Sequence, residues 1–363
     1  MENAVSNGSF ERLSILVVED NIYIRDIMEN VLRNLGFGWV ASARDGKEAV
    51  EFLTMVKNNP SRAGVMCVDI ILSDLVMSPI NGLLLLQWLR SSKDSPNRML
   101  PFVMISGAAD NQHVKAARDV GVTEFCAKPF SAKVLMDKLV EVIEYPRQFV
   151  ATTNYFGPDR RRKKFGVPTG EQEKRAFDES SATIVYSADN IKKPKKETEV
   201  WYFRLPNSLK EKAGGLSKGP IQIPENLLEE AEKQLARSAM DFADWAMTYL
   251  SKLGQLAADA LMRPSNRKAY FVEINLVALE LRGQGGTFGY PLITIFAKSL
   301  YEATQPGCKE TDAALELVKS HIDAMRAVIR DRVAGDGGEI GKALLKGFQA
   351  AITKYKNEAQ IVR

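Results

Sequence analysis

The sequence predicts an α/β region with a five-stranded, doubly wound parallel sheet, followed by an all-α antiparallel helical bundle. Two observations lead to this prediction. Over residues 13–147, short apolar runs alternate with segments of helical periodicity, and this alternation favours parallel strands joined by helical crossovers. Over residues 224–358, apolar residues recur at steps of three and four with glycine-rich breaks between segments, which is typical of packed helices.

Each predicted strand of the first region is followed by a predicted helix. The strands are rich in β-branched and apolar residues, and the helices carry an apolar stripe. The predicted strands are Ser14–Val18, Trp39–Ala41, Val68–Asp74, Phe102–Ser106 and Thr123–Lys128. The predicted helices are Ile22–Leu35, Gly46–Val56, Gly82–Leu89, Val114–Asp119 and Val134–Ile143.

Polar residues stand at the carboxyl ends of four of these strands. They are Glu19, Asp20, Asp74, Ser106 and Lys128. Because the carboxyl ends of parallel strands share one edge, we expect these side chains to converge on one cleft. Carboxylates held close together repel one another, and a hard divalent cation such as Mg²⁺ relieves that repulsion. A lysine and a hydroxyl could hold phosphoryl oxygens, so the pattern predicts Asp74 as the nucleophile of an acyl-phosphate-forming reaction.

Residues 13–147 resemble the receiver domain of response regulators in two-component signalling. The resemblance runs through Leu16–Asn21, Asp74–Met77 with Pro79 and Gly82, Ile105–Gly107, and Phe125 with Lys128–Phe130. It implies a flavodoxin-like fold, a bound Mg²⁺ and a cognate sensor histidine kinase or phosphotransfer protein as partner. It also implies Asp74 as phosphoacceptor, Glu19 and Asp20 as further metal ligands, Ser106 as switch hydroxyl, Phe125 as switch aromatic and Lys128 as phosphoryl partner.

The sequence departs from the receiver pattern at three positions. Ser78 stands between Met77 and the proline that usually follows it directly, which puts the path of this loop in doubt. Val76 and Ala108 are apolar where polar residues help to position an attacking water in similar receivers, so we hypothesise slow hydrolysis of an aspartyl phosphate. The alternative for the acids is a favourable pair at a helix N-terminus, and for Lys128 a plain loop.

Composition excludes several other classes of protein. The net charge is only +4, and the three cysteines are too far apart in sequence for a zinc motif or a disulfide framework. No apolar run reaches the ~20 residues of a membrane helix, so we expect no membrane insertion. Residues 1–12 read as a flexible tail. The expectation is a cytoplasmic protein that is not an enzyme.

Residues 148–223 lose the periodicity and read as a basic, largely irregular linker. Its basic clusters, Arg160–Lys164 and Lys192–Lys196, are either solvated or bind nucleic acid, anionic lipid or an acidic partner. Residues 199–206 are too aromatic to remain in water, so we expect a docking segment that packs on a flanking domain or adds a strand to a sheet edge.

The bundle contains one informative motif at the end of its second predicted helix. Predicted helices begin near Pro224, Ala269, Pro291, Thr311 and Ile340. The segment from Leu279 to Gly289 resembles the motif around the phosphorylated histidine of histidine-phosphotransfer domains. The matching positions are Leu279, Arg282, Gly283, Gly286 and Gly289. Leu279 takes the place of the histidine and cannot carry phosphate, so the bundle resembles a degenerate phosphotransfer domain. The alternative is a helix end whose glycines serve close packing.

The leading hypothesis is a response regulator whose bundle binds an unidentified protein, with a homodimer as a further possibility. A second hypothesis makes the bundle an active phosphotransferase through His321, although a histidine on a helix surface is the simpler interpretation. His113 is interpreted as a surface residue. A third hypothesis, nucleic-acid binding through the basic clusters, is not favoured because no helix-turn-helix pattern supports it.

Overall fold

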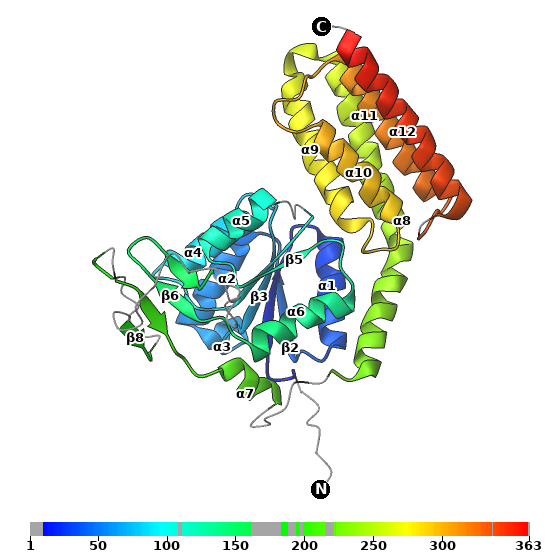
Figure 1. Cartoon of the computed structure of the whole chain (residues 1–363). Helices are drawn as coiled ribbons and strands as arrows, with labels where there is room; N and C mark the ends of the chain where they lie inside the picture. Colours follow the sequence, from blue (N-terminus) through cyan, green and yellow to red (C-terminus); the bar gives the residue numbers. More distant parts are fainter. Residues whose placement is uncertain are drawn as a thin grey trace, which may run out of the picture. The chain divides into compact units, whose positions relative to one another are not determined.

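The structure is a computed structural model that describes residues 10–107, 111–160, 183–187, 194–196, 199–214, 221, 223–335 and 337–361. The chain divides into two compact units (Figure 1). The first contains residues 1–126 and 132–231, and the second contains residues 127–131 and 232–363. Within the described residues, no helix combines the length and the apolar character needed to cross a membrane.

A five-stranded sheet forms the centre of the first unit, in the order β2-β1-β3-β4-β5. Strand β1 pairs in parallel with β2 and β3, and β3 pairs in parallel with β4. The strands are β1 (Ser14–Val18), β2 (Trp39–Ala43), β3 (Ile70–Asp74), β4 (Phe102–Ser106) and β5 (Glu124–Ala127). The predicted α/β fold, with helices after it, is therefore confirmed.

Helices cover both faces of this sheet (Figure 1). Every residue of β1, β3 and β4 is buried, which explains why these strands read as continuous apolar runs rather than alternating ones. The helices are α1 (Ile22–Asn34), α2 (Gly46–Asn58), α3 (Pro60–Ala63), α4 (Gly82–Ser91), α5 (Asn111–Val120) and α6 (Ala132–Glu144).

A second, smaller sheet lies where a largely irregular linker was expected. Its strands are β6 (Phe149–Ala151), β7 (Phe156–Pro158), β8 (Thr183–Val185) and β9 (Trp201–Phe203), in the order β7-β6-β9-β8, and α7 (Ser208–Gly214) follows. Phe149, Phe156 and Phe203 form its core together with Met99, which precedes β4. The strands have three residues each, too few for a periodic signal, so the sequence pattern missed them.

Arg90 of α4 joins the two sheets of the first unit. Its Nε donates to the carbonyl oxygen of Gly121 at 3.0 Å, and its Nη1 donates to the carbonyl oxygens of Arg98 and Leu100 at 2.9 and 2.8 Å. The guanidinium lies over the Phe149 ring, 5.1 Å from the centroid. Burial lowers the pKa of Arg90 to about 9, so the side chain still carries its charge at neutral pH. The small sheet is thus packed on the larger one around a buried cation.

The second unit is a helical bundle. Its helices are α8 (Glu225–Met262), whose first turns to residue 231 belong to the first unit, α9 (Arg267–Gln284), α10 (Pro291–Ala303), α11 (Asp312–Arg330) and α12 (Gly338–Ile361), with a short 3-10 turn at Pro264–Asn266. Consecutive helices pack on one another from α9 to α12. The Phe242 ring of α8 stacks on Phe288 and Tyr290, with centroids 5.2 and 5.6 Å apart. Helix α10 begins at Pro291, whose fixed φ angle is already that of a helix.

Candidate functional site

Three carboxylates meet at the carboxyl edge of the five-stranded sheet. Glu19 and Asp20 follow β1, and Asp74 is the last residue of β3, the neighbouring strand. Each offers a carboxylate oxygen, and these oxygens all lie within 4.8 Å of one another. Glu19 and Asp74 are buried, at 1% and 4% exposure, whereas Asp20 is exposed. The cluster therefore combines two buried acids with one acid that is open to solvent.

Backbone contacts fix the position of Asp74. Its Oδ1 accepts a hydrogen bond from the backbone N–H of Leu75 at 2.8 Å. The backbone N–H of Gly82, which begins α4, donates to the carbonyl oxygen of Leu75 at 3.1 Å. The loop between them starts and ends against the same strand end, and Ser78 and Pro79 at its tip are exposed. The extra residue Ser78 thus lies in the exposed part of the loop.

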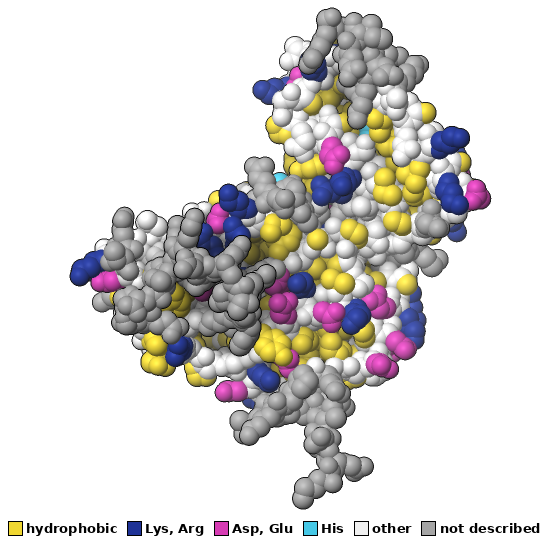
Figure 2. All heavy atoms as spheres, viewed as in Figure 1, with side chains coloured by type: hydrophobic (Ala, Val, Ile, Leu, Met, Phe, Trp, Pro, Cys, Tyr) yellow, Lys and Arg dark blue, Asp and Glu magenta, His cyan; other side chains and the backbone are white. Residues whose placement is uncertain are grey.

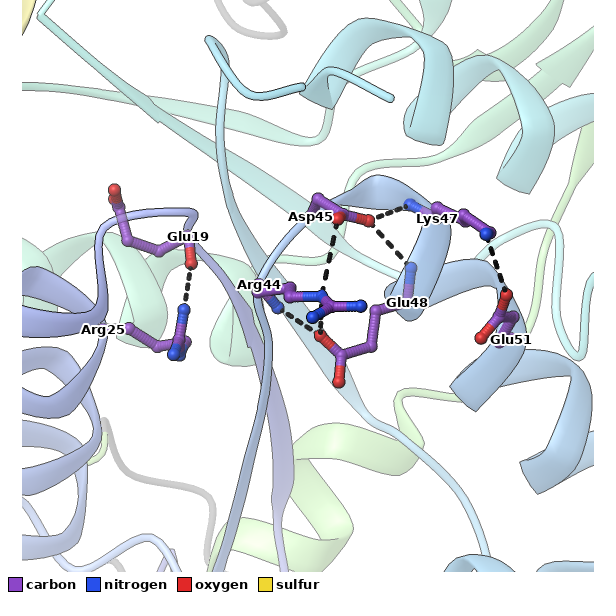
Figure 3. Close-up of polar contacts among 7 residues, drawn as sticks. All are labelled: Glu19, Arg25, Arg44, Asp45, Lys47, Glu48 and Glu51. Atoms are coloured by element: carbon purple, nitrogen blue, oxygen red, sulfur yellow. Dashed lines mark hydrogen bonds and ion pairs between the residues drawn. The ribbon is translucent and has the colours of Figure 1, made fainter. Parts of the chain in front are cut away.

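Glu19 is positioned by a residue that the sequence pattern did not single out. Nη1 of Arg25, on α1, donates to the backbone carbonyl oxygen of Glu19 at 2.8 Å (Figure 3). The Glu19 side chain is directed away from Arg25 in the same view. Asn21 caps α1 by accepting from the backbone N–H groups of Tyr23 and Ile24. The contacts of Arg25 and Asn21 therefore fix the turn that carries Glu19 and Asp20 to the start of α1.

The loop after Asp74 is also held by the N-terminus of α2. Asp45 caps this helix by accepting from the backbone N–H groups of Lys47 and Glu48 (Figure 3). The N–H of Gly46 donates to the carbonyl oxygen of Ile80 at 3.0 Å, and a Cβ at position 46 would lie 2.6 Å from that oxygen. Gly46 is therefore a second residue that the sequence pattern did not single out. No local pattern around Gly46 indicates a contact with a residue 34 positions away.

The remaining predicted residues occupy the ends of the other strands. Ser106 ends β4 and is 1% exposed, and Lys128 directly follows β5 and is 6% exposed. Phe125, within β5, is half-buried. Ala108 lies outside the described residues, so its hypothesised effect on hydrolysis is untested, while Val76 is half-buried in the loop after Asp74.

The donor set of this cluster fits Mg²⁺. The ion prefers oxygen ligands and keeps several of its waters, so it suits a few carboxylates at a partly open site. Two buried carboxylates and one exposed carboxylate within 4.8 Å of one another meet that requirement. Uncompensated, such proximity raises the energy of the ionised forms. The residues that would hold the ion are Glu19, Asp20 and Asp74.

The phosphotransfer-like motif in the bundle lies at the end of α9 and in the turn before α10. Leu279 is buried, and the Arg282 guanidinium lies over the Tyr301 ring at 5.3 Å. The hydroxyl of Thr294 donates to the carbonyl oxygen of Arg282 at 3.0 Å and accepts from the N–H of Gly286 at 2.8 Å. These contacts favour the alternative in which the motif serves helix packing, so the likeness to phosphotransfer domains stays a hypothesis.

His321 is in the bundle core rather than on the helix surface, and this corrects both earlier interpretations. It is 0% exposed. Its Nδ1 lies 2.7 Å from the Leu317 carbonyl oxygen, its Nε2 lies 3.0 Å from the Ser299 hydroxyl, and its ring meets Phe348 edge to face. Burial lowers the pKa of His321. A fully buried imidazole is inaccessible to a phosphoryl donor, so it does not fit an active phosphotransferase.

Comparison with known proteins identifies relatives of the first region. Residues 15–140 match the family model of the response regulator receiver domain. The chain is 32% identical over 134 residues to the chemotaxis protein CheY-3 of Vibrio cholerae serotype O1, covering 37% of this chain and 94% of that protein. It is also 32% identical over 132 residues to the chemotaxis protein CheY of Pseudomonas aeruginosa, covering 36% of this chain and 97% of that protein.

Among solved structures, the chemotaxis protein CheY4 of Vibrio cholerae is similar at 25% identity and a TM-score of 0.31. That similarity covers 36% of this chain and 98% of CheY4. The bundle lies outside the residues that the receiver family model matches.

Proposed function

The chain belongs to the response regulator receiver family through residues 15–140, and we propose that it is a phosphorylation-dependent response regulator of two-component signalling. Its partner on the input side is a sensor histidine kinase or a phosphotransfer protein. In this proposal the protein acts in the cytoplasm and is not an enzyme. The observation that carries the proposal is the meeting of Glu19, Asp20 and Asp74 within 4.8 Å at one sheet edge.

In this proposal Asp74 is the nucleophile. The hydrogen bond from Leu75 to Asp74 Oδ1 orients the carboxylate, so that its other oxygen can attack a phosphorus atom. Lys128 and Ser106, at neighbouring strand ends, donate to the phosphoryl oxygens. Mg²⁺ held by Glu19, Asp20 and Asp74 would neutralise charge on the carboxylates and on the phosphoryl oxygens.

Phosphorylation then changes the surface of the receiver. Ser106 moves toward the phosphoryl group, and Phe125, which is half-buried in this structure, turns inward into the space that Ser106 leaves. The surface formed by α5, β5 and α6 is altered, and either a partner or a second copy of the chain binds it differently.

The bundle is the output element in this proposal. Large apolar side chains are exposed on α9 and α10: Val272 at 51%, Leu276 at 47% and Ile295 at 45%. Figure 2 shows hydrophobic side chains exposed over the bundle on the face in view. Val272 and Leu276 are four residues apart on one face of α9, and neighbouring exposed apolar groups favour a protein interaction surface. The bundle therefore binds a protein rather than relaying phosphate. The basic clusters fall mostly outside the described residues, and nucleic-acid binding is not favoured.

Two measurements on the full chain test the proposal. Acetyl phosphate with Mg²⁺ should add one phosphoryl group to the protein in intact mass spectra, and removal of Mg²⁺ by EDTA should abolish the addition. Beryllofluoride, a phosphoryl mimic, should change the small-angle scattering profile or the oligomeric state, with Asp74→Asn as the unresponsive control. No phosphoryl uptake, or identical profiles with and without beryllofluoride, would defeat it.

A further inference from the structure

A hollow of about 880 Å³ lies at the edge of the five-stranded sheet opposite Asp74. Its floor includes residues that precede three strands: Val68 and Asp69 before β3, Leu100 before β4 and Thr123 before β5. Ligand sites for small molecules commonly span roughly 300–1,000 Å³. The hollow therefore has the size of a small-molecule site, and it is separate from the phosphorylation site because it is at the other end of the strands.

The segment from the end of β9 to α7 forms one wall of this hollow. Phe203, Leu205 and Leu209 line it from that side, and Phe149 of β6 lines it next to them. Phe203 and Phe149 are buried, whereas Leu205 at the rim is 39% exposed. The wall is thus apolar inside and accessible at its mouth. A typical receiver sheet alone would lack this wall, because every one of these residues follows α6 in the chain.

Charge in the hollow is predominantly positive. Its described lining contains four cationic side chains, Lys57, Arg147, Arg204 and Lys212, and one carboxylate, Asp69. Lys212 Nζ donates to Asp69 Oδ1 at 2.6 Å, so the carboxylate is already neutralised. Arg147 donates to the carbonyl oxygens of Thr123 and Asp159, and Lys57 donates to that of Lys93, so these two side chains are held in place. The described lining still has more cationic than carboxylate side chains, and Arg204 at the rim is placed to meet an anion.

Asp69 also accepts hydrogen bonds from Ser14, the first residue of β1. Its Oδ2 accepts from the backbone N–H of Ser14 at 2.9 Å and from the Ser14 hydroxyl at 3.3 Å. The ion pair is largely enclosed, with the Asp69 side chain 8% and the Lys212 side chain 30% exposed. Asp69 therefore contributes little negative potential to the hollow. Arg204, by contrast, is exposed at the rim, where it can reach a ligand without breaking a packed contact.

We propose that this hollow binds a small amphipathic anion, a carboxylate on an apolar chain or ring. The apolar body lies along Phe149 and Phe203, and the carboxylate lies toward Arg204 and its neighbouring cations. Burial of the apolar body supplies most of the affinity, and the cations supply the preference for a negative head group. Because Phe203 and Leu209 belong to the wall, the bound anion also holds the β9–α7 segment against the sheet.

Isothermal titration of the full chain with laurate, below the concentration at which laurate forms micelles, tests the proposal. Dodecyltrimethylammonium is the matched probe, since it has a chain of the same length and the opposite charge. Laurate should bind with one site per chain and the ammonium should bind at least about tenfold more weakly, a difference of roughly 1.4 kcal/mol. Equal binding of both probes, or no saturable laurate binding, would overturn the proposal.

Substitutions inside and outside the lining of the hollow test whether laurate binds there. Arg204→Glu should raise the Kd for laurate about fivefold, the effect of reversing one exposed charge. Met66→Trp, which adds bulk at an exposed lining position, should also weaken binding, whereas Arg44→Glu, a reversal outside the lining, should not. Asp74→Asn should leave binding unchanged, because the site does not depend on phosphorylation. Unchanged affinity in both lining variants, or displacement of laurate by an oligoglutamate peptide, would contradict a small-molecule site.

Discussion

Gly82 approaches Asp74 so closely that a Cβ added at position 82 would lie 2.2 Å from the Asp74 carbonyl oxygen. The same Cβ would also lie 3.2 Å from the Leu75 Cα. Both neighbours are backbone atoms at the end of β3, so neither can turn aside as a flexible side chain could. The start of α4 and the position of the candidate phosphoacceptor are therefore linked through a residue without a side chain.

We expect Gly82→Ala to lower both stability and phosphorylation. The added methyl group must push α4 away from the strand end, which costs on the order of 1–3 kcal/mol, as overpacking does in other cores. Urea unfolding followed by fluorescence measures the first effect, and the initial rate of phosphoryl uptake measures the second. A variant as stable and as rapidly phosphorylated as the wild type would contradict the close approach.

Gly347→Ala is the matched control for that substitution. Gly347 is exposed on α12, and a Cβ there would meet no other atom within 4 Å. Alanine should therefore stabilise the helix by ~0.5–1 kcal/mol, because glycine is the poorer helix former. Phosphoryl uptake should not change.

Phe203→Ala should destabilise the first unit by roughly 3–5 kcal/mol, the usual cost of removing a buried aromatic ring. Phe203 is 4% exposed and packs with Met99, Phe149 and Phe156. Urea unfolding of the full chain checks this, with Tyr186→Ala as control, because Tyr186 is 69% exposed and its loss should change stability by less than about 0.5 kcal/mol. Equal stabilities for the two variants would mean that β9 is not part of the folded core.

The sequence predicted the large sheet well but missed the small one, for a physical reason. In β3, the apolar run that ends at Asp74 is a local signal of a buried strand and a polar strand end. The small sheet instead depends on pairing between Val150 and Tyr202, which are 52 positions apart. The aromatic content of residues 199–206 indicated that this segment packs on something, but nothing in it named Met99 or Phe149 as its neighbours.

The same difference between local signals and long-range contacts applies to the candidate site. The positions of the acids and the lysine in the fold could be predicted because each stands at the end of a recognisable strand, while their roles stay a prediction. Arg25 and Gly46 were not found, since their roles consist of one hydrogen bond each, to Glu19 and to Ile80, in loops whose paths the sequence does not specify. His321 was misplaced although a local signal existed, because it stands three residues after Val318 and four before Met325 on the buried face of α11. The contacts with Ser299 and Phe348 then show how the imidazole is held there.

His321 should make the bundle less stable in mild acid. Burial lowers the pKa of His321, and the hydrogen bond to the Leu317 carbonyl offsets this only in part. The unfolded chain therefore binds a proton at His321 more readily than the folded chain does. The contribution of neutral His321 to the free energy of unfolding is present above the unfolded pKa near 6.5, and it is lost as the pH falls through the lower pKa of the folded chain.

Amide hydrogen exchange in α11 at pH 7 and pH 5 measures this dependence. Protection should fall at pH 5 in the wild type and fall less in His321→Gln. The pKa itself can be read from the imidazole resonance in a His113→Gln background, because the chain has only two histidines. An imidazole that titrates above pH 6.5 would refute the assignment of His321 to the core.

The aspartyl phosphate should be long-lived. Val76 is half-buried beside Asp74 and offers no polar group to position an attacking water. Val76→Asn should therefore shorten the lifetime, while Leu84→Asn, at an exposed position of α4, should not. Loss of the phosphoryl mass from purified protein gives the lifetimes, and a half-life of seconds in the wild type would refute the hypothesis.

The identity of the phosphorylated residue tests the central claim most directly. Borohydride reduces an aspartyl phosphate to homoserine, so peptide mass spectrometry after acetyl phosphate treatment reports the modified position. The account predicts homoserine at residue 74 in the wild type and in His321→Gln, and none in Asp74→Asn. Homoserine elsewhere, or phosphoryl uptake that persists in Asp74→Asn and is lost in His321→Gln, would contradict it.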